Sequence, residues 1–245
     1  MKCLHNFWRK IVFWVGDIRK IKHFPWVTWD VCEHEISIEE AVEATKLIKT
    51  GDIGVHLDRG YLSNFAIPGF MKHAFYFTNK ETTIEAISEG VVKRHALYPI
   101  ISDYTIILRP KNLNDEELLK AVIKAENIVG QQYDVKFAFD IEEEVKIFGG
   151  NEIVSARENV AHWDGGFSCT EVVTFVYAHV KDKLRLYRIK SRGKDVVIAD
   201  QFINNGFEVV WCSKSVTPEF AKQRGLHEEG IELIQKYWDS KKELF

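Results

Sequence analysis

The sequence predicts a fold of the α+β class. Capped helical segments flank several short segments that are rich in β-branched and aromatic residues, and the order is helix, strands, helix, long loop, helix and strands. The 245 residues are 46% hydrophobic, which is enough for a well-buried core. This length fits one domain with additions, or at most two small domains.

The first half of the chain is expected to form one helix followed by strands. Ser37 is a suitable N-cap for a helix over residues 37–49, which Gly51 ends. Strands are expected at four places, with a loop that contains glycine, proline and asparagine after the first strand and a turn between the second and third. These strands are residues 53–57, 73–77, 83–87 and 104–108.

The second half is expected to contain two further helices and a long loop before the last strands. Asn114 caps a helix over residues 115–129, and a second helix opens at Cys169. Between them residues 140–167 are polar and weakly patterned, and a loop of that length usually covers or shapes a site. Late strands are expected at residues 196–199 and 207–211, and Pro218 suits the first position of a last helical region.

The N-terminal residues 1–26 are basic and aromatic, with apolar residues near helical spacing. Two interpretations stay open, namely a helix at a membrane surface and a helix packed on its own domain. The apolar stretch from Ile11 to Val15 is too short for a signal-peptide core, and no segment is long enough to span a bilayer. We therefore expect a cytoplasmic protein, with peripheral membrane association left open.

Charge and cysteine content argue against two classes of function. The formal net charge is −3 with both signs mixed along the chain, so no basic field points to nucleic acid. The four cysteines, Cys3, Cys32, Cys169 and Cys212, are scattered without a CxxC pair. This spacing argues against a structural zinc site and favours a reducing compartment, and we expect no metal ion.

Cys169 follows a pair of glycines and opens an apolar run with helical spacing. A thiol at a helix start feels the positive end of the helix dipole and unpaired N–H groups, and both favour the thiolate. The alternative is a small buried hydrophobic residue, the commonest fate of a free cysteine. Position alone does not decide between the two.

A nucleophilic cysteine needs a base and usually a group that orients the base. His73 begins an aromatic strand, and Glu85 lies in the expected partner strand of the same hairpin. A short hairpin can place both side chains on one face, where the carboxylate would fix the imidazole tautomer. Taken alone, a strand-end histidine and a solvated edge charge are the simpler interpretation, and His56, His95 and His162 compete as the base.

The motifs taken together resemble those of a known family. In chain order they are Gly51-Asp52-Ile53, Leu62-Ser63-Asn64, Ile67-Pro68-Gly69, Lys72-His73-Ala74, Ile84-Glu85-Ala86 with Glu89-Gly90-Val91, Tyr133-Asp134 with Phe137, and Cys169-Thr170-Glu171-Val172-Val173. Their order and spacing, over about residues 45–213, are similar to those of the permuted papain-like cysteine hydrolases of the NlpC-type superfamily. More narrowly, they resemble the YiiX-like branch.

The resemblance implies a fold and a domain plan. It implies a circularly permuted papain-like fold, with a central antiparallel sheet packed against helices, over residues 41–245. Residues 1–40 would then be an N-terminal extension and residues 140–167 an insertion.

The resemblance also implies roles for four residues. Cys169 would be the nucleophile, and His73 the general base that becomes the acid for the leaving group. Glu85 matches the polar residue that orients the histidine, and Tyr133 matches a tyrosine near the nucleophile that helps to bind an oxyanion. No cofactor is required.

The leading hypothesis is therefore a hydrolase that cleaves an amide or ester bond through an acyl-enzyme at Cys169. The substrate would be a peptide, an amino-acid amide or a lipid-like small molecule. A lipid acyl hydrolase or acyltransferase with the same site is the second hypothesis, and a catalytically inactive binding module is the third. Thr170 departs from the serine common in relatives, and the lack of a visible export signal argues against peptidoglycan as substrate.

Overall fold

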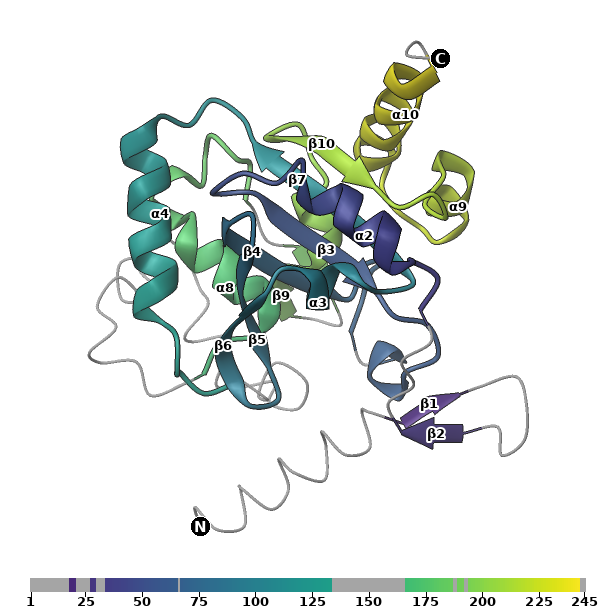
Figure 1. Cartoon of the computed structure of the whole chain (residues 1–245), viewed down its shortest axis with the longest axis horizontal. Coiled ribbons are helices and arrows are strands. Elements are labelled where there is room, and N and C mark those ends of the chain that lie inside the picture. The colour runs from purple at the N-terminus through teal and green to yellow at the C-terminus, as the bar shows by residue number, and fades with distance from the viewer. Residues whose placement is uncertain are drawn as a thin grey trace.

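An antiparallel sheet forms the centre of the protein (Figure 1). The computed structural model describes residues 18–20, 27–29, 34–65, 67–133, 166–186, 189–191 and 194–242. The strands of the central sheet are β3 (Ile53–Leu57), β4 (His73–Asn79), β5 (Thr82–Ile87), β6 (Gly90–His95), β7 (Tyr104–Pro110) and β10 (Phe207–Cys212). Their order across the sheet is β10-β7-β3-β4-β5-β6, and every neighbouring pair is antiparallel.

Helices cover both faces of this sheet (Figure 1). The α-helices of the described residues are α2 (Ile38–Thr45), α3 (Leu97–Ile100), α4 (Asp115–Asn127), α8 (Cys169–Val176), α9 (Pro218–Gln223) and α10 (Glu228–Lys242). Short 3₁₀ helices are η1 (Leu62–Phe65), η3 (Ala178–Val180) and η4 (Ala199–Phe202). Two hairpins stand apart from the sheet, β1 (Ile18–Lys20) with β2 (Val27–Trp29) and β8 (Ile189–Ser191) with β9 (Lys194–Val196). This architecture confirms the α+β class.

The two faces of the sheet bury two separate sets of side chains, because successive residues of a strand point to opposite faces. On β4, Ala74 and Tyr76 join the core that contains α4, α8 and the C-terminal helices. Phe75 and Phe77 join a second core with α2 and α3. Gly54 on β3 leaves room for the Phe75 ring, since a Cβ atom there would lie 2.1 Å from it.

Most elements of the first half match the sequence prediction. Ser37 accepts a hydrogen bond from the Glu40 N–H and caps α2, which ends four residues before the expected Lys49. Asn114 and Glu117 form a reciprocal capping box at the start of α4. Strand β6 and helix α3 were not predicted from the periodicity.

Two local predictions are wrong. The expected strand at residues 196–199 is replaced by the end of β9 and the start of η4. At the N-terminus, residues 18–20 form a strand with residues 27–29, so the helical interpretation of residues 1–26 fails there. Residues 1–17 lie outside the described residues, as does most of the expected 140–167 loop.

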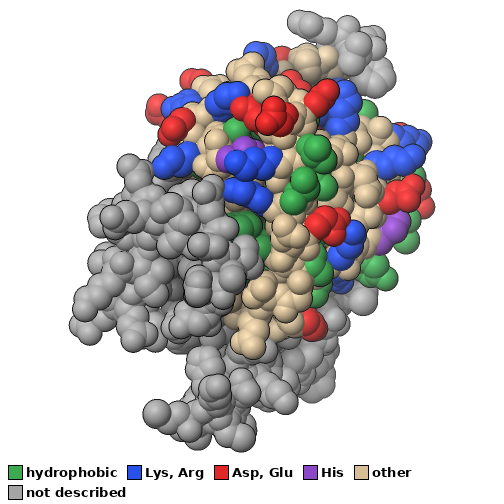
Figure 2. Space-filling view, turned by 90° about the vertical axis from the view of Figure 1, so that its left-hand side faces the viewer, with side chains coloured by type: hydrophobic (Ala, Val, Ile, Leu, Met, Phe, Trp, Pro, Cys, Tyr) green, Lys and Arg blue, Asp and Glu red, His purple; other side chains and the backbone are tan. Residues whose placement is uncertain are grey.

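The side of the molecule on which α4 lies shows basic and acidic side chains interspersed, with apolar side chains between them (Figure 2). Leu119 and Ile123 on α4 are among the exposed large hydrophobic residues. No helix in the described part of the chain has both the length and the apolar character to cross a bilayer.

Candidate active site

Helix α8 places Cys169 in its first turn. Ser168 is the N-cap residue, and its N–H donates a 2.9 Å hydrogen bond to the Glu171 carboxylate. Val172 and Val173 are fully buried and hold α8 against the sheet. The Cys169 thiol thus sits at the positive end of a packed helix and is only 7% exposed.

The start of β4 lies next to this thiol. Sγ of Cys169 is 3.9 Å from the carbonyl oxygen of Lys72, and the N–H of Ala74 bonds to the sulfur. Pairing of β4 with β5 involves Tyr76, Phe77 and Asn79, at the other end of the strand. The contacts of Lys72 and Ala74 with Cys169 thus join the start of β4 to the N-terminus of α8.

His73, between these two backbone contacts, bonds to both Glu85 and Cys169. Its Nε2 lies 2.7 Å from Oε2 of Glu85, whose side chain is 2% exposed. A side-chain hydrogen bond joins His73 to Cys169, and because Nε2 is engaged by Glu85, Nδ1 is the nitrogen left for the sulfur. Nη1 of Arg94 lies 3.6 Å from the second carboxylate oxygen of Glu85. Cysteine, histidine, glutamate and arginine thus form a continuous row of alternating charge.

The electrostatics of the row favour an ionised thiol–imidazole pair. Burial alone would lower the pKa of His73, but the charge of Cys169 and the hydrogen bond and charge of Glu85 raise it to about 10. Burial likewise opposes the thiolate, but the charge and hydrogen bond of His73, with the amides of Ala74 and Thr170, lower the pKa of Cys169. Burial would raise the pKa of Glu85, whereas the bond and charge of His73 lower it.

His56 stands beside His73 on the neighbouring strand. The two residues are directly opposite in the β3–β4 register, and their ring centroids are 4.8 Å apart. Nδ1 of His56 donates to the carbonyl oxygen of Pro99 over 2.7 Å, and Nε2 lies 3.9 Å from Asp58. Burial, partly opposed by the charge of Asp58, lowers the pKa of His56, so this ring is neutral at pH 7. His56 thus packs beside the His73 ring, and Glu85 bonds to His73 rather than to His56.

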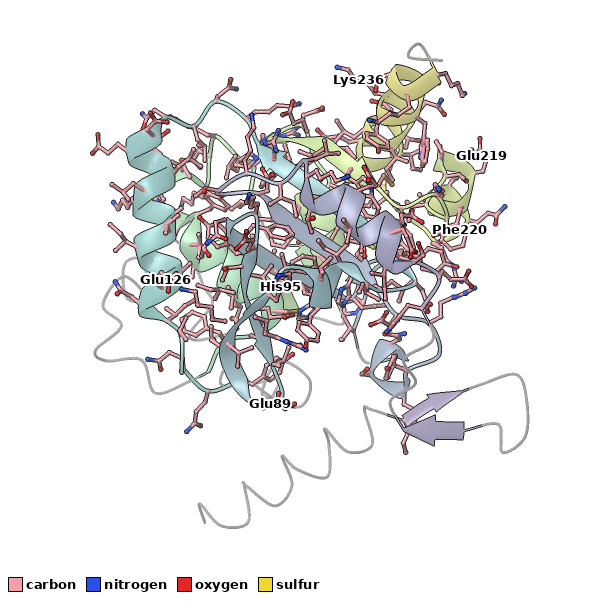
Figure 3. The ribbon with its side chains drawn as sticks, viewed as in Figure 1. Glu89, His95, Glu126, Glu219, Phe220 and Lys236 are labelled. Carbon is pink, nitrogen blue, oxygen red and sulfur yellow. The ribbon has the colours of Figure 1, made fainter. Side chains whose placement is uncertain are left out.

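The sequence also suggested Tyr133 as an oxyanion residue, and His95 and His162 as alternative bases. Tyr133 pairs through its backbone with Phe167, close to Cys169 in the chain, and its ring packs against the main core. Its oxyanion role stays a prediction. His95 ends β6 opposite Thr82, at the far end of the hairpin from His73 (Figure 3). His162 lies outside the described residues.

Sequence reasoning missed two charged residues near the site. Arg94 faces Glu85 from β6, and Asp200 on η4 accepts hydrogen bonds from the loop that leads to His73. A lone arginine on an unpredicted strand carries no sequence signal. Asp200 is separated from its partners by about half the chain, so no local pattern reveals the contact.

Two other buried residues, Asp52 and Cys212, lie away from this site. Asp52 is fully buried, and it accepts hydrogen bonds from the Lys49 N–H and from two nitrogens of Arg109. Cys212 is 2% exposed and belongs to the main core, where burial raises the pKa of its thiol. Among the described side chains, no group of three or more histidines, cysteines and carboxylates is arranged to hold a metal ion.

No family model matches the chain, and no curated protein is significantly similar to it.

Proposed function

We propose that the protein is a cysteine-nucleophile hydrolase that cleaves an amide or ester bond through an acyl-enzyme at Cys169. The observation that carries the proposal is the buried row of Cys169, His73 and Glu85, in which Nε2 of His73 lies 2.7 Å from the carboxylate. Strongly shifted pKa values in a thiol–imidazole pair are typical of catalytic sites. We extend the proposal to the permuted papain-like fold, because His73 and Glu85 precede Cys169 in the chain and α8 packs on β4 and β5.

Acylation begins with attack of the Cys169 thiolate on the substrate carbonyl carbon, which forms a carbon–sulfur bond. The protonated His73 gives its Nδ1 proton to the leaving amine or alkoxide as the carbon–nitrogen or carbon–oxygen bond breaks. The negative oxygen of the tetrahedral intermediate is stabilised by N–H groups at the start of α8. We assign Tyr133 as the side chain that assists them.

Deacylation reverses the proton transfers with water as the second substrate. Neutral His73 takes a proton from the water, whose oxygen attacks the thioester carbon, and the Cys169 thiolate leaves. Glu85 keeps Nε2 of His73 protonated, so that Nδ1 is the nitrogen that exchanges the proton. The products are a carboxylic acid and the regenerated thiolate–imidazolium pair, and the substrate class is a peptide, an amino-acid amide or a lipid-like ester.

The test uses p-nitrophenyl acetate as an activated acyl donor. Rapid mixing is expected to release one equivalent of p-nitrophenolate in a burst, followed by slower turnover. Mass spectrometry after an acid quench is expected to find one acetyl group on Cys169. A series of longer p-nitrophenyl esters and of aminoacyl anilides then ranks the acyl groups.

Two variants make the test specific. Cys169→Ala should abolish the burst, and Cys212→Ala is the matched control because Cys212 is also buried but lies in the core. A burst that survives in Cys169→Ala would refute the proposal. Absence of any acetyl adduct on Cys169 in the unmodified chain would leave the site as a binding site without turnover.

A further inference from the structure

A buried carboxylate, that of Asp200, accepts hydrogen bonds from the backbone just before His73. Asp200 is 4% exposed, and its two oxygens accept hydrogen bonds from the consecutive N–H groups of Phe70, over 2.7 Å, and Met71, over 2.6 Å. Phe70 and Met71 are themselves buried. Gly69 permits this close approach, because its φ is +89° and a Cβ atom would lie 2.8 Å from Oδ2 of Asp200.

Phe70 and Met71 lead directly to two backbone contacts of the thiol, those with Lys72 and Ala74. Lys72, next after Met71, supplies the carbonyl oxygen 3.9 Å from Sγ of Cys169. His73 supplies the imidazole, and Ala74 supplies the N–H that bonds to the sulfur. A displacement of the chain at Met71 therefore moves both the imidazole and these two backbone partners of the thiol.

A carboxylate is a costly anchor for a loop. Burial disfavours its charged form, and the N–H groups of Phe70 and Met71 and the charges of Lys72 and His227 face it in compensation. An apolar side chain could fill the same volume without that cost, but it could not orient two consecutive N–H groups. The geometry thus favours directional control of the backbone over simple packing.

We infer that Asp200 is a positioning residue of the thiol–imidazole site, which sets the distance between Sγ of Cys169 and the ring of His73 through the backbone of residues 70–74. The inference rests on the proposed function, since it concerns the same pair. Asp200 belongs to η4, which follows Cys169 in the chain, and it holds the backbone segment that precedes His73.

The test compares Asp200→Asn with Asp52→Asn. An asparagine oxygen can accept a hydrogen bond from one of the two N–H groups, but its NH₂ group faces the other N–H. One of the two hydrogen bonds is therefore lost. Asp52 is an equally buried carboxylate at the opposite end of the β3–β4 pair from His73. Three readouts are used: amide exchange of Phe70 and Met71, the NMR titration of His73, and the iodoacetamide alkylation rate of Cys169.

Asp200→Asn is expected to speed exchange at Phe70 and Met71, to lower the titration midpoint of His73, and to slow alkylation at pH 7 by about 10- to 100-fold. Asp52→Asn is expected to lower the melting temperature while leaving the last two readouts unchanged. If Asp200→Asn does not fold, Gly69→Ala, which presses a methyl group on the carboxylate, is expected to give the same changes in His73 and Cys169.

A folded Asp200→Asn protein with the His73 midpoint and alkylation rate of the unmodified chain would overturn the inference. Equal changes in Asp52→Asn would overturn it as well, because they would reflect general destabilisation. The His73 titration needs no turnover, so a protein that never forms an acyl-enzyme refutes the proposed function while the positioning role is still decided.

Discussion

Neutralising Glu85 gives the sharpest prediction about the site. In Glu85→Gln the side chain keeps its size, but the negative charge next to Nε2 of His73 is lost. An opposite charge at this range shifts a pKa by about 1–3 units, which corresponds to about 1.4–4 kcal/mol. Since the pKa of His73 is raised to about 10 in the intact site, the variant should titrate at about 7–9.

The sign of this shift decides how the pH window changes. Imidazolium is the acid for the leaving group, so activity is lost as pH rises through the pKa of His73. Glu85→Gln should therefore move the alkaline limb of the pH–rate profile down by about 1–3 units.

The assay is an NMR titration of the His73 ring in protein labelled at histidine, with His73→Gln assigning the signal. Glu89→Gln is the matched control, because Glu89 lies on the turn between β5 and β6 and is exposed (Figure 3). The control should titrate as the unmodified chain does. A His73 midpoint in Glu85→Gln that stays near 10, or rises, would refute the reasoning.

Three further predictions follow from the same contacts. Cys169→Ala should lower the pKa of His73 from about 10 toward its ordinary 6.5, as measured by NMR titration. In the unmodified chain, protonated His73 adds stability that is present below pH 6.5 and is lost as pH rises through 10. This contribution to the free energy of unfolding, measured by urea titration at different pH, should be smaller in Cys169→Ala. His56→Ala should slow alkylation of Cys169 about 10-fold, whereas His56→Phe, which keeps a ring against His73, should retain most of the rate. An equal loss of rate in both variants would contradict the role of the His56 ring in holding His73. Arg109→Gln should lower the free energy of unfolding by about 3 kcal/mol, because Asp52 stays buried without its cation, with Cys169 alkylation unchanged.

The sequence was most informative where a local signal determines structure. Ser37 and Asn114 are caps with side-chain oxygens, and both helices begin where those residues predict. The aromatic run after His73 favours a buried strand, and β4 lies in the interior of the sheet. Strand β6 was missed because its second half carries Lys93 and Arg94, and these polar residues hide the period-two pattern.

The candidate site depends on contacts that no local pattern encodes. The 2.7 Å bond between His73 and Glu85 could be anticipated, because one hairpin joins them. The approach of Cys169 could be expected only from the resemblance, because packing of α8 on β4 joins distant segments. The contacts of Asp200 and the packing of the His56 ring beside His73 could not be predicted from the sequence, since both depend on tertiary packing.

The measurement that tests the central claim most directly is the rate of iodoacetamide alkylation at Cys169 against pH, located by mass spectrometry, in the unmodified chain and in His73→Ala. We expect fast labelling well below pH 8 in the unmodified chain, because the thiolate is already formed beside the imidazolium. In His73→Ala the labelling should shift to the pH range of an ordinary thiol, whose pKa is about 8.5. Slow labelling of the unmodified chain that is the same in His73→Ala would contradict the thiolate–imidazolium pair and the function built on it.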